Sequence, residues 1–106
     1  MITITDEFTS ELHLTLSDDA VALHLVDVDG NEVRVTLSRE GMRHLLAVGE
    51  SDLPRRAGTF DEGVQVFLWD DRDEPVYRFA LWDADSAGEG AYTFYPRTAD
   101  IDALSI

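Results

Sequence analysis

Two stretches of strictly alternating polar and apolar residues near the start of the chain constrain the fold more than any other feature. They are Glu11–Ser17 and Ala20–Leu25, and a period of two is typical of strands with one buried face. Asp18 and Asp19 lie between them and suit a two-residue hairpin turn. Such a turn makes every inward pair apolar: Leu12 with Leu25, Leu14 with Leu23, and Leu16 with Val21. The sequence therefore predicts a hairpin with a fixed register.

The next turn extends this hairpin to a third strand. Asp27–Asn31 contains Gly30, which suits a three-residue loop with the glycine in the left-handed backbone region. A two-residue turn at Asp29 and Gly30 would instead set apolar residues against Arg34 and Thr36. The three-residue loop keeps the inward pairs apolar: Leu25 with Val33, Leu23 with Val35, and Val21 with Leu37. It therefore predicts a three-stranded sheet with nine Leu and Val residues on one face.

A short helix is predicted directly after this sheet. Ser38 is a typical N-cap residue. Leu37 and Met42 have the spacing of a hydrophobic staple, and Gly49 is a typical residue after a helix end. We therefore expect a helix over about 39–48 that lies across the apolar face of the three strands.

The second half of the chain contains a further group of strands. The segments 64–69, 76–82 and 91–95 are rich in aromatic and β-branched residues, and the turns between them are polar or glycine-rich. Residues 49–63 show no periodicity, which predicts a long loop. At the other end of the chain, Ile2–Ile4 is expected to pair as an edge strand.

These elements predict an α+β fold that is mostly antiparallel β. We expect about six or seven strands, with one short helix over about 39–48 between two β units. At 106 residues the chain has the size of one domain, and either half alone would be too small to bury a core. The expected organisation is therefore a single domain over residues 1–106.

Charge is the most unusual feature of the composition. The chain has 22 acidic residues, eight arginines and no lysine, which gives a net charge of −14. Three explanations are open: a genome that favours arginine codons, adaptation to high salt, and a function in binding basic partners. The negative charge argues against direct binding to nucleic acid or to an anionic membrane. If the charge is functional, it predicts a basic protein partner.

The cysteine count and the apolar runs bear on the cellular compartment. With no cysteine, neither a disulfide framework nor a thiolate metal site can form. No apolar run approaches the roughly 18 residues that a membrane helix needs. The first residues, Met1–Glu7, lack the basic and apolar regions of a signal peptide. We therefore expect a cytoplasmic protein, and no cofactor is indicated.

The predicted registers bring three polar residues into one row on the outer face of the first sheet. His13 faces His24 within the hairpin, and Arg34 faces His24 from the third strand. Two histidines at this spacing can bind a divalent metal or act as a base, with Glu11 as a further ligand. Polar residues also occupy this face in sheets that have no site, and Arg34 disfavours a bound cation. We therefore expect a structural or interface role for the row, and no metal.

The second group of strands places aromatic residues on both of its faces. If the two long strands alternate, the face opposite the core carries four notable residues: Phe67, Trp69, Arg78 and Trp82. Tryptophan and arginine are enriched among the residues that dominate protein interfaces, and exposed apolar clusters mark contact sites. Two interpretations are open. Either this face is a contact surface, including one between copies of the chain, or other segments cover it as core.

No sequence motif specifies a reaction. The chain has no phosphate-binding glycine loop, no nucleophile elbow and no zinc-protease helix motif, and its acidic turns lack the ligand spacing of an EF-hand. The sequence therefore predicts a non-catalytic interaction or regulatory module. A specific form is an inhibitor or immunity-type protein that binds a basic partner. The alternatives are a structural subunit of an oligomer and a small metal-dependent enzyme that uses His13 and His24.

Overall fold

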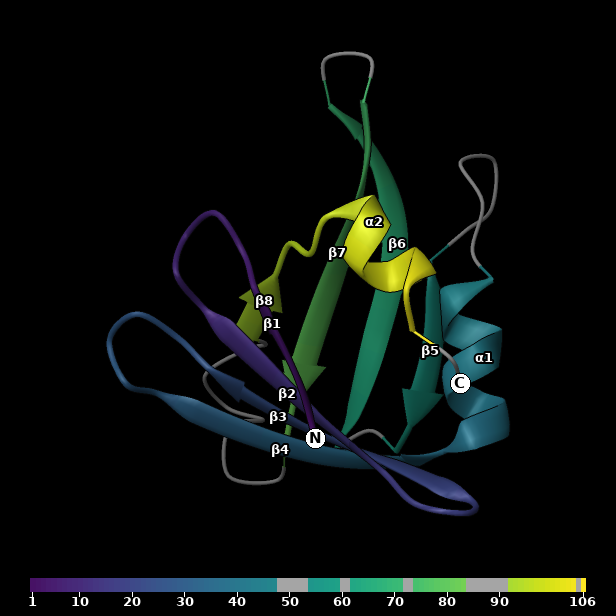
Figure 1. Ribbon diagram of the computed structural model, residues 1–106. Helices are drawn as coiled ribbons and strands as arrows, with labels where there is room; N and C mark the ends of the chain where they lie inside the picture. Colours follow the sequence, from purple (N-terminus) through teal and green to yellow (C-terminus); the bar gives the residue numbers. More distant parts are fainter. Residues whose placement is uncertain (48–53, 60–61, 72–73, 84–91, 105) are drawn as a thin grey trace.

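Two antiparallel sheets and two short helices make up the computed structural model, which describes residues 1–47, 54–59, 62–71, 74–83, 92–104 and 106 (Figure 1). The first sheet contains β1 (Ile2–Thr5), β2 (Glu11–Leu16), β3 (Ala20–Val26) and β4 (Glu32–Ser38), in this spatial order. The second contains β5 (Arg55–Gly58), β6 (Gly63–Asp71), β7 (Glu74–Trp82) and β8 (Tyr92–Phe94). Helix α1 (Arg39–Leu46) follows β4, and helix α2 (Thr98–Asp102) follows β8. Both sheets are therefore simple meanders.

The register of the first sheet is the one predicted from the alternation. Leu12 lies opposite Leu25, and Leu23 lies opposite Val35. The inward side chains of β3 and β4 are almost completely buried, and the outward ones between them keep solvent contact. β1 pairs with β2 at the edge of the sheet, as expected for Ile2–Ile4. The alternation thus determined which face of each strand is buried.

The loop between β3 and β4 has the predicted three-residue form. Gly30 has a φ of +86°, and its N–H donates to the Asp27 carbonyl at 3.1 Å. The Asp27 N–H donates to the Asn31 carbonyl at 2.9 Å. The Asp27 carboxylate also accepts hydrogen bonds from the backbone N–H groups of Asp29 and Asn31. These bonds fix the offset between the two strands.

Helix α1 begins at the predicted cap. The Ser38 Oγ accepts a hydrogen bond from the Gly41 N–H at 2.9 Å, which satisfies one of the free donors of the first turn. The two residues of the predicted staple, Leu37 and Met42, are both buried. The helix ends at Leu46, with Ala47 as its C-cap, about two residues before the predicted end, and the predicted stop residue Gly49 lies outside the described residues.

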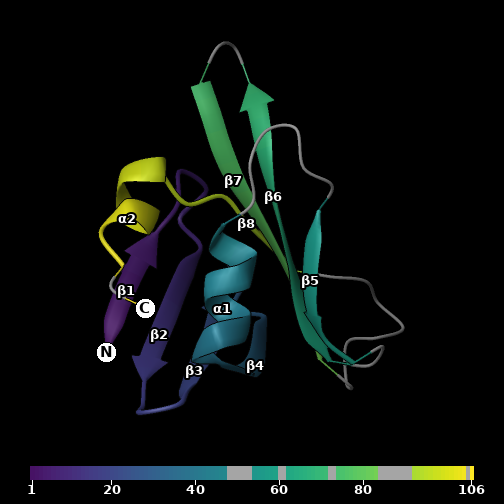
Figure 2. The same ribbon diagram turned by 90° about the vertical axis from the view of Figure 1, so that its right-hand side faces the viewer.

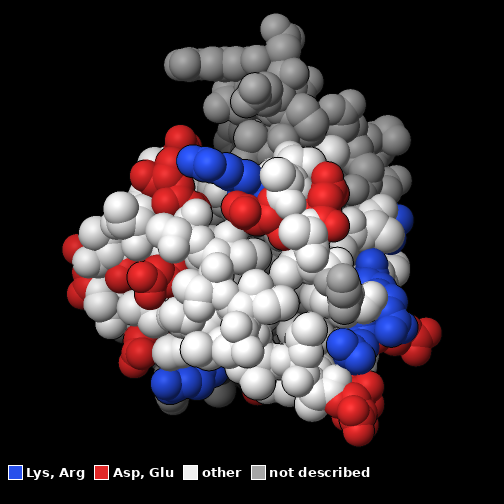
Figure 3. Space-filling view, in the orientation of Figure 1, with Lys and Arg blue, Asp and Glu red and all other residues white. Residues whose placement is uncertain are grey.

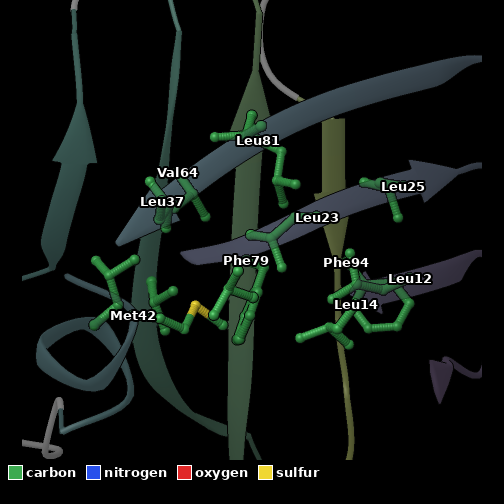
Figure 4. Packing of buried hydrophobic residues seen from close by; sticks show 14 of the residues in the cluster. Leu12, Leu14, Leu23, Leu25, Leu37, Met42, Val64, Phe79, Leu81 and Phe94 are labelled. Atoms are coloured by element: carbon green, nitrogen blue, oxygen red, sulfur yellow. The ribbon is translucent and has the colours of Figure 1, made fainter. Parts of the chain in front are cut away.

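The core lies between the two sheets, whose strands cross steeply (Figure 1). Leucines of the first sheet reach toward Phe79 and Phe94 of the second (Figure 4), and both phenylalanines are fully buried. α1 lies beside the space between the sheets and contributes Met42 and Leu45, while α2 contributes Ile101 (Figure 2). The inward faces of both sheets therefore share one cluster of buried residues.

The described residues form eight strands, and the sequence predicts six or seven. The additional strand is β5, which lies within the segment 49–63 predicted as a loop. β5 has no hydrophobic alternation, and it forms because its backbone pairs with β6, with Arg56 opposite Gln65. α2 is a second helix beyond the one predicted, and it docks through the buried side chain of Ile101. The α+β, mostly β class is confirmed.

Candidate functional site

Arg78 stands between two aromatic rings on the outer face of the second sheet. β6 and β7 pair so that Phe67 lies opposite Arg78, and Tyr95 follows directly after β8 on the other side. The guanidinium carbon of Arg78 lies 5.1 Å from the centroid of the Phe67 ring and 5.9 Å from that of Tyr95. Both distances are within the roughly 6 Å range of cation–π attraction. The two rings therefore hold the guanidinium group of Arg78 in place.

Trp82 reaches a second arginine because glycine leaves room for its ring. Trp82 lies opposite Gly63 on β6, and Gly63 lies opposite Gly58 on β5. A Cβ atom at Gly63 would come within 3.0 Å of the Cζ2 atom of Trp82, so the indole ring lies across β6 at this position. Its centroid is 5.1 Å from the guanidinium carbon of Arg56 on β5. A second cation–π pair thus spans three strands.

A buried aspartate links this face to the first sheet. Asp6 lies between β1 and β2 and is only 7% exposed. Its Oδ1 accepts hydrogen bonds from the backbone N–H groups of Phe8 and Ser10, both at 3.0 Å, and its Oδ2 accepts one from the Tyr95 N–H at 3.2 Å. The Phe8 ring meets the Tyr95 ring edge-on, with centroids 5.5 Å apart. The Asp6 hydrogen bond and the contact between Phe8 and Tyr95 thereby connect the aromatic residues of the second sheet to the first sheet.

We refer to these residues as the arginine–aromatic face: Arg56, Phe67, Arg78, Trp82 and Tyr95, with Phe8 at the border. Arg56 and Phe8 are exposed, and the other four residues are half-buried. The face is therefore neither a fully exposed contact surface nor a fully covered part of the core, which are the two interpretations that the sequence left open. The first sheet and both helices lie on one side of the second sheet (Figure 2). Among the described residues, no helix or strand covers its other side.

The structure brings together three of the four residues predicted for this face, namely Phe67, Arg78 and Trp82. The side chain of Trp69 lies outside the described part of the structure. Sequence reasoning missed Arg56, because β5 was assigned to a loop. It also missed Tyr95, because nothing local in the sequence sets the register of β8 against β7. The signal that could have found Arg56 is the glycine opposite Trp82, which marks a place where a ring can cross a strand.

The histidine row lies on the outer face of the first sheet. His13 lies opposite His24, and His24 lies opposite Arg34. The two imidazole centroids are 5.6 Å apart. Thr3 of β1 lengthens the row, because its Oγ1 lies 3.0 Å from the Nδ1 atom of His13. The row therefore crosses all four strands of the sheet.

The Nε2 atoms of the two histidines face different carboxylates. His13 Nε2 lies 3.4 Å from Glu11 Oε2, and His24 Nε2 lies 2.9 Å from Glu32 Oε1. Glu11 and Glu32 both pair with Val26, from opposite sides of β3. In the part of the chain that the structure describes, no three His, Asp or Glu side chains come close enough to hold a metal ion. The row is thus two separate histidine–glutamate pairs.

Two groups outside these surfaces have shifted pKa values. Burial acts to raise the pKa of the Asp27 carboxyl, but hydrogen bonds from the side chain and backbone of Asn31 and from two further backbone N–H groups of the turn lower it overall. Burial raises the pKa of the Tyr77 hydroxyl, and the negative charge of Asp102 on α2 raises it further. Asp27 lies in a turn and Tyr77 lies in the core, so both pKa shifts arise from contacts that hold the fold together.

A comparison with protein families, curated proteins and solved structures finds no match to this chain. Among the described residues, no helix combines the length and the apolar character that crossing a membrane requires. A proposal about function therefore rests on the geometry of the residues themselves.

Proposed function

We propose that this protein is a non-catalytic interaction or regulatory module and that the arginine–aromatic face is its contact surface. The observation that carries the proposal is the stacking of two arginines on aromatic rings across a half-covered sheet face. Interface binding energy concentrates in tryptophan, tyrosine and arginine, since aromatic rings offer a large contact area at a low entropy cost. The rings also hold the guanidinium groups in place, which lowers the cost of ordering them on binding.

The proposal assigns no catalytic role to the histidine row. A metal site or an acid–base pair needs its groups to converge on one point, whereas His13 and His24 each face their own glutamate. The small metal-dependent enzyme is the alternative, and it is tested by a variant that carries both His13→Ala and His24→Ala. Zinc binding and an unfolding midpoint equal to those of the wild type would remove this alternative. Loss of bound zinc in the variant would support it instead.

A specific form of the proposal is an inhibitor or immunity-type protein that acts on a basic partner in the cytoplasm. The net charge of −14 supports it, because a negative surface attracts cationic proteins and accelerates their association. Figure 3 shows the acidic side chains of one side of the molecule in separate groups around an uncharged centre. The acidity is spread over the molecule, while two arginines lie among the described side chains of the arginine–aromatic face. The net charge therefore supports a basic partner, and the stacked rings support a contact surface.

Capture of proteins from the native lysate on the immobilised chain tests the proposal. A variant with Phe67→Ala and Trp82→Ala removes two rings from the face, and Thr36→Ala, exposed on the outer face of the first sheet, is the matched control. Circular dichroism checks that all three proteins are folded. We expect the double variant to lose the specifically captured protein, with a cost of at least about 2 kcal/mol for truncating a hot spot. Equal capture by all three proteins would contradict the proposal.

Sedimentation of the same variants tests the alternative of a structural oligomeric subunit. If copies of the chain meet through this face, the wild type self-associates and the double variant is monomeric at the same concentration. Two molecules with a net charge of −14 repel each other, so salt would strengthen their contact. Salt would weaken binding to a basic protein instead. The salt dependence therefore distinguishes the two kinds of partner.

A further inference from the structure

Resting on the proposed function, we infer that the ring of Phe8 receives an arginine side chain of the basic partner. Phe8 lies in the loop between β1 and β2, at the border of the arginine–aromatic face, and it is 56% exposed. Among the aromatic residues that the structure describes, it is the only one whose side chain is exposed. An exposed aromatic ring at the border of a contact surface is available to a side chain of another protein.

The other rings of this face show which group such a ring attracts. The guanidinium carbon of an arginine lies 5.1 Å from the centroids of Phe67 and of Trp82, and 5.9 Å from that of Tyr95. Phe8 instead meets the Tyr95 ring edge-on, at an interplanar angle of 62°. An edge-on contact occupies at most one face of a ring, so at least one face of Phe8 can take a cation from outside.

The loop that carries Phe8 has the same backbone form as the loop over residues 27–31. The Asp6 N–H donates to the Ser10 carbonyl, and the Thr9 N–H donates to the Asp6 carbonyl, both at 3.1 Å. The two equivalent hydrogen bonds close the loop between β3 and β4. The position that Gly30 occupies there, with a φ of +86°, is occupied here by Thr9, with a φ of +65°. The Phe8 loop thus keeps a β-branched residue where the equivalent loop has glycine.

Backbone strain at Thr9 keeps the ring in a defined position. A β-branched residue is disfavoured in the left-handed region, and such strain persists only where the surrounding contacts enforce it. The Asp6 carboxylate supplies these contacts, because its Oδ1 accepts hydrogen bonds from the N–H groups of Phe8 and Ser10, on both sides of Thr9. Strained backbone of this kind is found preferentially at binding sites. A ring that is already fixed loses little conformational entropy when a partner binds.

The charges of the loop favour an arginine over an acidic or uncharged side chain. The charged residues of the loop and of the strand ends that it joins are Asp6, Glu7 and Glu11, all of them acidic. Glu7 is the exposed neighbour of Phe8. A guanidinium group stacks flat on a ring and keeps its N–H donors in its own plane, where they can reach a carboxylate beside the ring. The net charge of −14 attracts the same cationic side chains over a longer range.

Two labelled peptides test the inference by fluorescence anisotropy at about 0.15 M salt. They share one extended glycine–serine sequence, and one carries arginines where the other carries citrullines, which have nearly the same shape but no charge. Each peptide is titrated with the wild type and with Phe8→Leu, a variant that keeps an apolar side chain but removes the ring. We expect Phe8→Leu to weaken binding of the arginine peptide about two- to fivefold, because a cation–π contact is lost, and to leave the citrulline peptide unchanged. The general attraction of the acidic chain for cations is the same in both proteins and cancels in this comparison.

Further variants assign the contact to the ring of Phe8. Phe8→Trp is expected to tighten binding of the arginine peptide about twofold, because indole is the strongest cation–π partner. Val28→Ala is the matched control, since Val28 is an apolar residue that is 69% exposed in the equivalent loop, and it should leave both affinities unchanged. Phe8 itself is exposed, so its substitutions leave the core intact, and circular dichroism confirms the fold of each variant.

Several outcomes would overturn the inference. They are absence of binding, an arginine peptide that binds Phe8→Leu as tightly as the wild type, equal weakening of both peptides by Phe8→Leu, and an equal loss in Val28→Ala. The proposed function is judged separately by the capture experiment. If the variant with Phe67→Ala and Trp82→Ala loses its partner while Phe8→Leu affects neither peptide, the face is the contact surface but Phe8 receives no arginine. If only the arginine peptide responds to Phe8→Leu while capture is unaffected, Phe8 binds arginine and the rest of the face is not the contact surface.

Discussion

Asp6→Ala is expected to destabilise the protein strongly, although Asp6 lies in a short loop. Asp6 is 7% exposed, and its carboxylate accepts three backbone hydrogen bonds, from Phe8, Ser10 and Tyr95. A buried N–H group that loses its acceptor costs about 1–3 kcal/mol. The Ser10 bond is buried and the other two are partly buried, so we expect a loss of about 3–5 kcal/mol in the free energy of unfolding. That is a large fraction of the roughly 5–15 kcal/mol that keeps a domain folded.

Urea unfolding followed by tryptophan fluorescence measures this loss. Glu7→Ala is the matched control, because Glu7 is the exposed neighbour of Asp6, and its effect should stay within about 0.5 kcal/mol. Asp6→Asn keeps one acceptor oxygen but turns an NH₂ group toward a backbone N–H, so its loss should be intermediate. If Asp6→Ala unfolds within about 1 kcal/mol of the wild type, the three hydrogen bonds do not hold the loop to Tyr95.

Three further substitutions test other local features. Thr9 has a φ of +65°, which is strained for a β-branched residue, so Thr9→Gly should raise the free energy of unfolding by about 1 kcal/mol; a decrease in urea unfolding would show that the strain is absent. Gly63→Ala should disturb the pairing of β5 with β6 and lower the free energy of unfolding, because the added Cβ would clash with the Ala57 carbonyl oxygen as well as lie 3.0 Å from the Trp82 ring; a urea unfolding midpoint equal to that of the wild type would contradict this. The lowered pKa of Asp27 contributes stability above its ordinary value of 3.8, and this contribution is lost as the pH falls through the lower folded-state pKa. The stability difference between the wild type and Asp27→Asn should therefore shrink as urea unfolding is measured at progressively lower pH in this acid range, and a constant difference would refute the assignment.

The first sheet could be predicted to the level of individual residue pairs because two independent local signals agree. The alternation in Glu11–Ser17 specifies a buried face, and Asp18 and Asp19 specify a short turn. A slip of one residue would turn every leucine of a strand to the solvent. The same agreement at Gly30 selected the three-residue loop, and the observed pairing of His24 with Arg34 follows from it.

β5 and α2 could not be predicted because their stability comes from contacts that are distant in the sequence. The segment Arg55–Gly58 carries no apolar stripe and becomes a strand by pairing with β6. Arg55 is further fixed by a hydrogen bond from its Nη1 to the His44 carbonyl of α1, at 3.0 Å. α2 has only five residues, too few to be stable alone, and it is held by the burial of Ile101. Neither the pairing of β5 with β6 nor the burial of Ile101 produces a recognisable pattern in the neighbouring sequence.

The candidate site likewise contains some residues that could be predicted from the sequence and others that could not. Phe67, Arg78 and Trp82 could be assigned to one face because β6 and β7 form a hairpin with clear alternation. Arg56 and Tyr95 join the face because β5 pairs with β6 and β8 pairs with β7. The hydrogen bond between the Tyr95 N–H and Asp6 joins positions 89 residues apart. The residues of such a site can therefore be predicted from the sequence only where they lie on the two strands of a recognisable hairpin.

The location of the acidic residues determines how much the net charge says about a partner. Asp18 and Asp19 form the turn between β2 and β3, Asp27 and Asp29 lie in the turn between β3 and β4, and Glu62 precedes β6. Aspartate is frequent in turns because its carboxylate accepts hydrogen bonds from nearby backbone N–H groups, as Asp27 does here. Part of the acidity is therefore tied to turns, while the outward strand positions of the second sheet carry arginines among the described side chains. Since charges more than about 8–10 Å away are largely screened at physiological salt, the face that touches a partner should decide its chemistry more than the total charge does.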